Sequence, residues 1–140
     1  MNQYSEKFNS YAVPGDTITA EIDGFTLTAR IENDQDSTID DDDSHNVDQS
    51  VTGCNDDQQT KLLAARKAWR LDQWYYCGIV ISASYKGVPI WDHCASIWAI
   101  ECNYPDSDNS YLTEVANELI AEAIDQANGA LELMREAICT

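Results

Sequence analysis

Two alternating runs of apolar and polar residues, joined by the dipeptide Asp23-Gly24, place the strongest constraint on the fold of this chain. In residues 18–22 every second side chain is apolar, and residues 25–31 repeat this alternation. A period of two directs alternate side chains to opposite faces of a strand. Asp-Gly is typical of the type I′ turn, in which both central residues adopt positive φ. The sequence therefore predicts an antiparallel hairpin with one buried face.

Strands are also predicted in the middle of the chain. Residues 74–85 are rich in aromatic and β-branched side chains, and Lys86-Gly87 turns this strand into residues 88–91. Residues 92–102 fit either a strand or a short helix, because their apolar residues match both periods in part. We favour the strand.

Two segments have the apolar period of amphipathic helices. The first runs through residues 62–69 and follows Asp56 and Asp57, which can cap it. The second covers residues 112–127, and Gly129 either ends it or lies inside a helix that continues to residue 138. This order of elements predicts an α+β fold, in which an antiparallel sheet made of the N-terminal hairpin and the central strands packs against two or three helices.

Two segments have no apolar period. We expect residues 1–10 to be a loose N-terminal segment that is not held against the domain. Residues 33–56 have few apolar side chains and no Lys or Arg. The second segment contains four consecutive acids, Asp40, Asp41, Asp42 and Asp43. Such a composition buries too little apolar surface to offset the entropy lost on ordering. We expect a single domain over residues 1–140 with a mobile acidic loop at about 33–56.

The charge of the chain restricts its partners. Its 25 acids and eight bases give a formal net charge of −17, which disfavours direct contact with nucleic acid or anionic membranes and favours basic surfaces and cations. The longest apolar run, near residues 77–81, is too short to span a bilayer, and the polar N-terminus does not resemble a signal peptide. Five cysteines without a CxxC motif are typical of reduced thiols. These features predict a cytoplasmic protein.

Part of this charge falls on one side of the last predicted helix. At 100° per residue, six carboxylates share an arc of about 80°, opposite the apolar residues. They are Glu114, Glu118, Glu122, Asp125, Glu132 and Glu136. Like charges four residues apart oppose helix formation. Three interpretations stay open: a solvated helix face, a ridge that docks on a basic partner, and a cation-binding surface.

Patterns typical of catalytic or metal sites are incomplete. Asp34 and Asp36 begin like a calcium-binding loop, but the loop lacks glycine at its sixth position. His93 and Cys94 are adjacent and therefore poorly placed to chelate one zinc ion, and no local motif supports Cys94 as a nucleophile. The sequence predicts no catalytic residues, no metal site and no cofactor.

Several segments resemble small acidic proteins encoded by bacteriophages, prophages and mobile elements. They are residues 13–16, 74–80, 92–101 and 108–119, which read VPGD, WYYCGIV, DHCASIWAIE and DNSYLTEVANEL. The resemblance implies a context and assigns no functional residues. Small acidic phage proteins are similar in type to anti-restriction and anti-CRISPR proteins, several of which mimic DNA.

These observations predict an anti-defence inhibitor of phage type that is not an enzyme. It would act as an acidic DNA mimic in the host cytoplasm, where the six helix acids and Asp40 to Asp43 would bind a basic nucleic-acid-binding protein of the bacterial host. The alternative is an acidic phage accessory or assembly protein that binds partners through exposed aromatic residues, with its charge serving solubility. Whether the chain forms a homodimer stays open.

Overall fold

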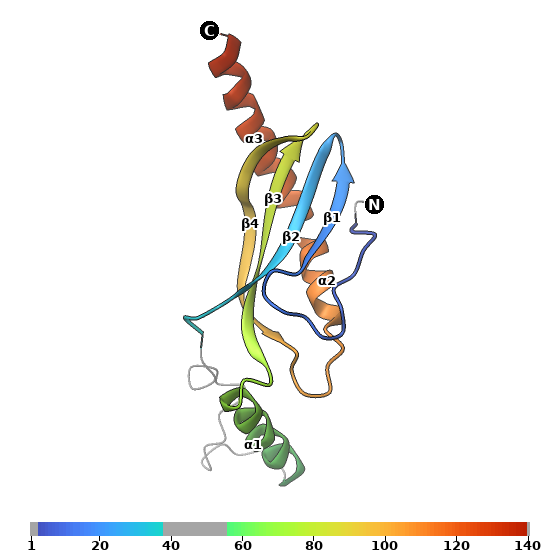
Figure 1. Cartoon of the computed structure of the whole chain (residues 1–140), viewed down its shortest axis with the longest axis vertical. Coiled ribbons are helices and arrows are strands. Elements are labelled where there is room, and N and C mark those ends of the chain that lie inside the picture. The colour runs from blue at the N-terminus through green and yellow to red at the C-terminus, as the bar shows by residue number, and fades with distance from the viewer. Residues whose placement is uncertain (1–2, 38–55, 140) are drawn as a thin grey trace.

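A computed structural model describes residues 3–37 and 56–139 of the chain (Figure 1). The elements are β1 (Thr17–Ile22), β2 (Phe25–Asn33), α1 (Asp56–Arg70), β3 (Tyr75–Tyr85), β4 (Val88–Cys102), α2 (Ser110–Glu118) and α3 (Ile120–Cys139). The strands form one antiparallel sheet in the order β1-β2-β3-β4. The predicted α+β fold is confirmed.

Both tight turns of the sheet have positive φ at their two central residues, as the sequence predicts for Asp23-Gly24. Asp23 and Gly24 have φ values of 56° and 88°, and Lys86 and Gly87 have φ values of 48° and 86°. Positive φ at both central positions matches the right-handed twist of the flanking strands. The predicted hairpin is confirmed, and residues 92–102 belong to a strand, as we favoured.

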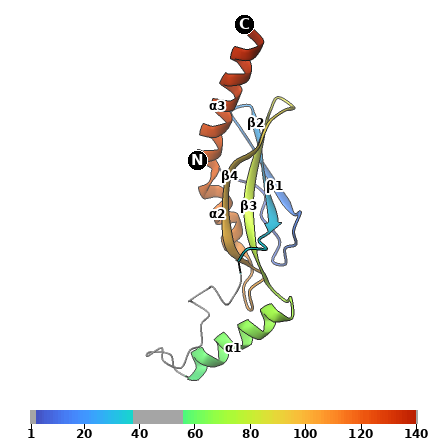
Figure 2. The ribbon, with the colours of Figure 1, turned by 90° about the vertical axis from the view of Figure 1, so that its left-hand side faces the viewer.

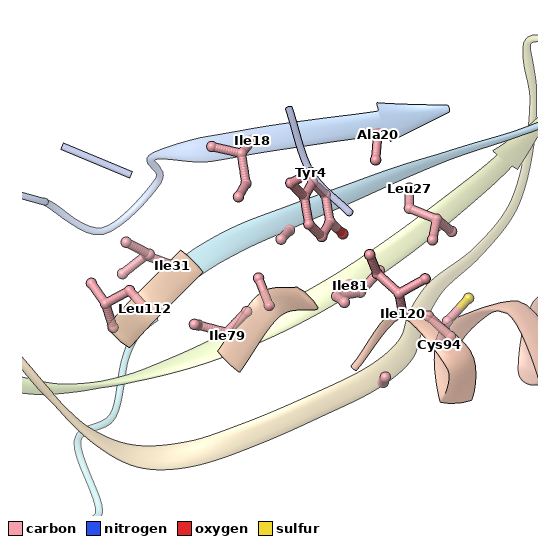
Figure 3. Close-up of a cluster of buried hydrophobic side chains, with 14 of the residues drawn as sticks. Tyr4, Ile18, Ala20, Leu27, Ile31, Ile79, Ile81, Cys94, Leu112 and Ile120 are labelled. Atoms are coloured by element: carbon pink, nitrogen blue, oxygen red, sulfur yellow. The ribbon is translucent and has the colours of Figure 1, made fainter. Parts of the chain in front are cut away.

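The helices pack against the sheet in two places. Helices α2 and α3 cover one face, whereas α1 lies beyond the end of the sheet at which β3 begins (Figures 1 and 2). The covered face holds the main core, where side chains of all four strands meet Leu112 and Ile120 of the helices (Figure 3). Helix α1 joins the sheet through Trp74, which is buried and donates its Nε1–H to the carbonyl oxygen of Ala65 at 2.8 Å.

Three irregularities in its pairing with β3 bend β4. Between its pairs with Cys77 and Ile79 this strand has one extra residue, and Ala99 adopts a φ of 62° there. Between its pairs with Ile81 and Ala83 it has two extra residues, and between its pairs with Ala83 and Ser84 it has one. A single extra residue moves the side chains that follow it to the opposite face of the sheet, so the alternation of β4 is interrupted. This explains why the apolar pattern of the segment fitted both a strand and a helix.

The last helical segment breaks at Leu119, and α3 continues through Gly129. Of the two alternatives at Gly129, continuation is correct. The N–H of Leu119 lies 3.2 Å from the carbonyl oxygens of both Val115 and Ala116. This sharing marks one tightened turn, after which α3 continues in nearly the same direction as α2 (Figure 1).

Gly129 gives a stability prediction, because it lies inside α3 and a Cβ placed there would meet no atom within 4 Å. We expect Gly129→Ala to raise the free energy of unfolding by about 0.5–1 kcal/mol, since alanine loses less backbone entropy in a helix. Urea denaturation followed by circular dichroism measures this change. As a control, Gly24→Ala should destabilise the protein, because Gly24 has a φ of 88° and its Cβ would lie 2.9 Å from Tyr85. A loss of stability in Gly129→Ala would contradict the helical assignment.

The N-terminal segment lies along α2 and is held there, so the prediction that residues 1–10 form a loose N-terminal segment is wrong. The N–H of Tyr4 donates to Oδ1 of Asn117 at 2.8 Å, and the N–H of Phe8 donates to Oγ1 of Thr113 at 3.0 Å. The rings of Tyr4 and Phe8 are buried in the main core. Tyr4 and Phe8 are four residues apart, and so are their partners Asn117 and Thr113. Residues four apart lie on the same side of a helix, so both contacts fall on one side of α2.

Two asparagines hold the end of this segment. Asn103 bonds both backbone groups of Ala12: its Oδ1 accepts from the N–H at 2.8 Å and its Nδ2 donates to the carbonyl oxygen at 2.7 Å. Asn109 Nδ2 donates to Asn103 Oδ1 at 2.8 Å and to the carbonyl oxygen of Ser10 at 3.1 Å. Both asparagines have a φ of 62°, a conformation that Asn tolerates better than most residues. Asn109 is the N-cap residue of α2, but its side chain forms this network and makes no cap hydrogen bond.

Candidate partner-binding surface

All six acids predicted on the last helix are exposed, on α2 and α3. We call Glu114, Glu118, Glu122, Asp125, Glu132 and Glu136 the acidic ridge. The buried residues of the two helices face the core or the N-terminal segment, and these are Leu112, Thr113, Ala116, Ile120, Ala123 and Ala127. The carboxylates therefore lie on the side of the helices that faces away from the core.

The break at Leu119 changes the ridge little. A tightened helical turn rotates by about 120° per residue, compared with about 100° in an α-helix. One such residue therefore shifts the later acids by only about 20° relative to the earlier ones. Glu118 and Glu122, on either side of the break, stay about one turn apart.

One base accompanies the ridge. Arg135 Nη1 lies 3.5 Å from Oε1 of Glu132, and both side chains are more than half exposed to solvent. The same guanidinium lies 5.9 Å from the ring centroid of Tyr85. Within residues 3–37 and 56–139, no ion pair involves the other five ridge acids. A solvated pair at this distance neutralises little of the charge, so the ridge stays strongly negative.

The second half of the predicted site, Asp40 to Asp43, lies outside the described residues. The beginning of the acidic loop is described, and there Asp34 has a structural role. Its Oδ2 accepts hydrogen bonds from the N–H of Ala99 and from Oγ of Ser37, both at 2.9 Å. Burial acts to raise the pKa of Asp34, but these hydrogen bonds and one from the Asp36 N–H hold it below its usual value.

The Asp34 carboxylate thus binds the bulge of β4 from the end of β2. Its oxygens are occupied by donors of the protein. In the described part of the chain, no three side chains of His, Cys, Asp or Glu converge as ligands for a metal ion. The resemblance of Asp34 and Asp36 to the beginning of a calcium loop therefore has another explanation, which is the support of β4.

His93 and Cys94 point to different environments. His93 is exposed, and its Nε2 lies 2.8 Å from Oγ of Ser96. Cys94 is buried in the main core. Burial, followed by the charge of Asp92, raises the pKa of the Cys94 thiol. A buried thiol with a raised pKa is a poor nucleophile at neutral pH, because the thiolate is the reactive form.

An open apolar groove, which the sequence did not predict, lies beside the ridge. The groove encloses about 530 Å³ between α3 and β4. Its lining residues are Ile90, Trp91, Gln126, Gly129, Ala130 and Leu133. Trp91 is 45% exposed and Leu133 is 68% exposed. One residue of the sequence could have indicated this groove. At 100° per residue, Leu133 lies outside the apolar side of the last helix, so its side chain is not needed for the core.

Comparisons of the chain with protein-family models, with curated proteins and with solved structures found no match. Among the helices that the structure describes, none is both long and apolar enough to cross a membrane. The acidic ridge and the groove beside it are the candidate partner-binding features of the described residues.

Proposed function

We propose that this chain is a phage-type inhibitor of a host defence system, of the anti-CRISPR or anti-restriction kind, and that it acts as an acidic DNA mimic. The acidic ridge occupies the basic nucleic-acid-binding surface of a protein in the cytoplasm of the bacterial host. The observation that carries the proposal is the exposure of all six ridge acids on one side of α2 and α3, where Arg135 is the one base that pairs with them among the described residues.

The spacing of the ridge supports this proposal. Acids four positions apart on a helix lie about 6 Å apart along its axis, whereas phosphates of one DNA strand lie about 3.4 Å apart along theirs. The match is coarse, but both arrays present a regular row of negative charge to a basic surface. A row of one sign steers a basic partner into contact and weakens with salt.

The energetics of the helices also support it. Glu114 with Glu118, and Glu132 with Glu136, are like-charged pairs four residues apart, and each disfavours its helix by a few tenths of a kcal/mol. Burial of the opposite, apolar side of α2 and α3 offsets this repulsion. A solvated face needs no such row, because interleaved bases would serve solubility at a lower energetic cost.

Charge reversal on the ridge tests the proposal. The assay uses a purified defence nuclease, either a CRISPR effector or a restriction enzyme, whose DNA binding the native chain inhibits in a mobility-shift experiment. We expect the triple variant Glu114→Lys, Glu118→Lys and Glu122→Lys to lose inhibition by roughly 100-fold, because each reversal replaces an attraction with a repulsion. Inhibition by the native chain should also fall steeply as salt is raised.

A matched variant separates the ridge from net charge. Glu6, Glu21 and Asp36 are exposed acids away from the ridge, so reversing all three to Lys changes the charge by the same amount. This variant should keep inhibition within a few-fold of the native chain. Equal losses in the two variants would mean that net charge alone acts, and an unchanged ridge variant would overturn the proposal.

The alternative function, an accessory or assembly protein that binds through aromatic residues, also has an observation in its favour. Trp91 and Trp98 of β4 are 45% and 42% exposed, although indole rings are usually well buried. Under this alternative, Trp91→Ala or Trp98→Ala abolishes binding of the partner and charge reversal on the ridge leaves it intact.

A further inference from the structure

The groove between α3 and β4 has the shape and lining of a docking surface. On the strand side it is formed by Ile90 and Trp91, and on the helix side by a stretch of α3 that includes Ala130 and Leu133. Its opening follows from Gly129, which offers no side chain to fill the space above it. An exposed apolar surface with a polar rim is typical of a protein interaction site.

The rim of this groove is acidic. Residues three or four positions apart are neighbours on a helix surface, and each acid of α3 stands at this spacing from a residue that lines the groove. These acids are Glu122, Asp125, Glu132 and Glu136. On the strand side, Trp91 is followed by Asp92, which is exposed. The acidic ridge therefore borders the groove along its length.

Arg135 and Lys86 do not neutralise the negative charge of the rim. Arg135 pairs with Glu132, and both Arg135 and Lys86 lie over the ring of Tyr85, at 5.9 Å and 5.3 Å from its centroid. A segment that fills the groove needs apolar side chains to insert between α3 and β4. It also needs basic side chains beside them, to meet the acids of the rim.

We infer that the groove binds a basic amphipathic helix of the partner protein. Apolar side chains at helical spacing insert beside Trp91 and Leu133, and Lys or Arg side chains of the same helix pair with the rim. The inference rests on the proposed function, because one partner covers both the ridge and the groove. A second copy of this chain suits the groove less well, since it brings a further net charge of −17 against the acidic rim.

Two synthetic peptides probe the groove of the full chain. Each has about 18 residues, or five helical turns, and consists of Leu and Lys. In the first peptide the leucines recur at helical spacing on one face, and in the second the same residues are shuffled around the helix. Fluorescence anisotropy of the labelled peptides should show that the native chain binds the amphipathic peptide about tenfold more tightly, the ratio expected from one buried apolar anchor.

Two variants close the groove or remove an anchor without changing charge. Gly129→Trp fills the space from the helix side, and Leu133→Gln removes an apolar side chain that is 68% exposed, so neither should disturb the core. Both should reduce the tenfold preference to near one, whereas Gly129→Ala should keep it. A preference that persists in both Gly129→Trp and Leu133→Gln overturns the inference.

The charge of the rim is tested separately. Replacing Glu122, Asp125 and Glu132 by their amides should weaken both peptides. If the groove variants have no effect but this variant weakens both peptides, the inference fails and the proposed function stands. If the amide variant leaves both affinities unchanged, the acidic surface is not a binding surface and the proposed function fails too. A native dimer in analytical ultracentrifugation that Gly129→Trp dissociates would identify a second copy as the occupant and overturn the inference.

Discussion

Replacing Asn109 by Ala is expected to lower the free energy of unfolding by about 3–5 kcal/mol. Asn109 is fully buried, and its Oδ1 accepts from the N–H of Asn103 at 2.9 Å while its Nδ2 donates to Asn103 Oδ1 and to the carbonyl oxygen of Ser10. Alanine leaves the N–H of Asn103 and the carbonyl oxygen of Ser10 without this partner, while Asn103 Oδ1 keeps only the N–H of Ala12. Each orphaned group costs about 1–3 kcal/mol. The φ of 62° adds strain, because alanine tolerates this region less well than asparagine.

Urea denaturation measures this loss, and two further variants identify its causes. Asn117→Ala removes a single hydrogen bond, to the N–H of Tyr4, and should cost about 0.5–1.5 kcal/mol. Asn109→Gly relieves the strain at positive φ but restores no hydrogen bond, so it should recover only about 1 kcal/mol relative to Asn109→Ala. A stability of Asn109→Ala within 1 kcal/mol of the native chain would contradict a structural role for the network.

The Asn109 variants should also release the N-terminal segment, since its backbone near Ser10 and Ala12 is held by this network. Limited proteolysis under native conditions can detect this, because a segment that leaves α2 becomes accessible to cleavage. Cleavage before residue 12 should be much faster in Asn109→Ala than in the native chain.

Replacing Gly78 by Ala is expected to cost about 2–3 kcal/mol, as overpacking at a close contact does. A Cβ at Gly78 would lie 2.2 Å from Cε3 of Trp98 and 2.6 Å from two further atoms of the ring. The indole of Trp98 therefore lies directly over the Gly78 backbone on the face of the sheet that α2 and α3 leave open. The substitution must displace either the ring or the strand beneath it.

A double-mutant cycle with Trp98→Ala tests this contact. Because the smaller side chain relieves the clash, the double variant should be more stable than the sum of the single effects predicts. Tryptophan emission should shift to longer wavelength in Gly78→Ala, as Trp98 moves into water. Gly87→Ala is the control, since its Cβ meets nothing within 4 Å and only its φ of 86° opposes the change. Additive effects in the cycle would show that the ring does not rest on Gly78.

Much of the secondary structure follows from short stretches of sequence. The hairpin at Asp23-Gly24 depends on two residues that accept positive φ and on the alternation beside them, so its evidence is local. The same holds for the amphipathic pattern of residues 112–127, whose phases place the ridge acids opposite the apolar residues. The exposure of those acids follows from these phases, and their role in binding stays a prediction.

Other features depend on residues far apart in the chain. Asn117 bonds Tyr4 across 113 positions, and Asn103 bonds Ala12 across 91 positions. The residues of the N-terminal segment alone therefore did not indicate that the segment is ordered. The break at Leu119 and the bulges of β4 likewise arise where helices and strands adapt to one another. Local periodicity gave no sign of the break at Leu119, and it left residues 92–102 open between a strand and a helix.

The sequence by itself determined the alternation of β1 and β2, the type I′ turn at Asp23-Gly24 and the side of the last helix on which its acids lie. The reason is that backbone propensity and apolar period act over a few residues. Only the tertiary structure decided that Trp98 covers Gly78, that the N-terminal segment lies on α2, and that a groove opens beside the ridge. Each of these features forms where two segments that are distant in sequence come into contact, and the sequence pattern of one segment does not indicate which surface of the other it will meet.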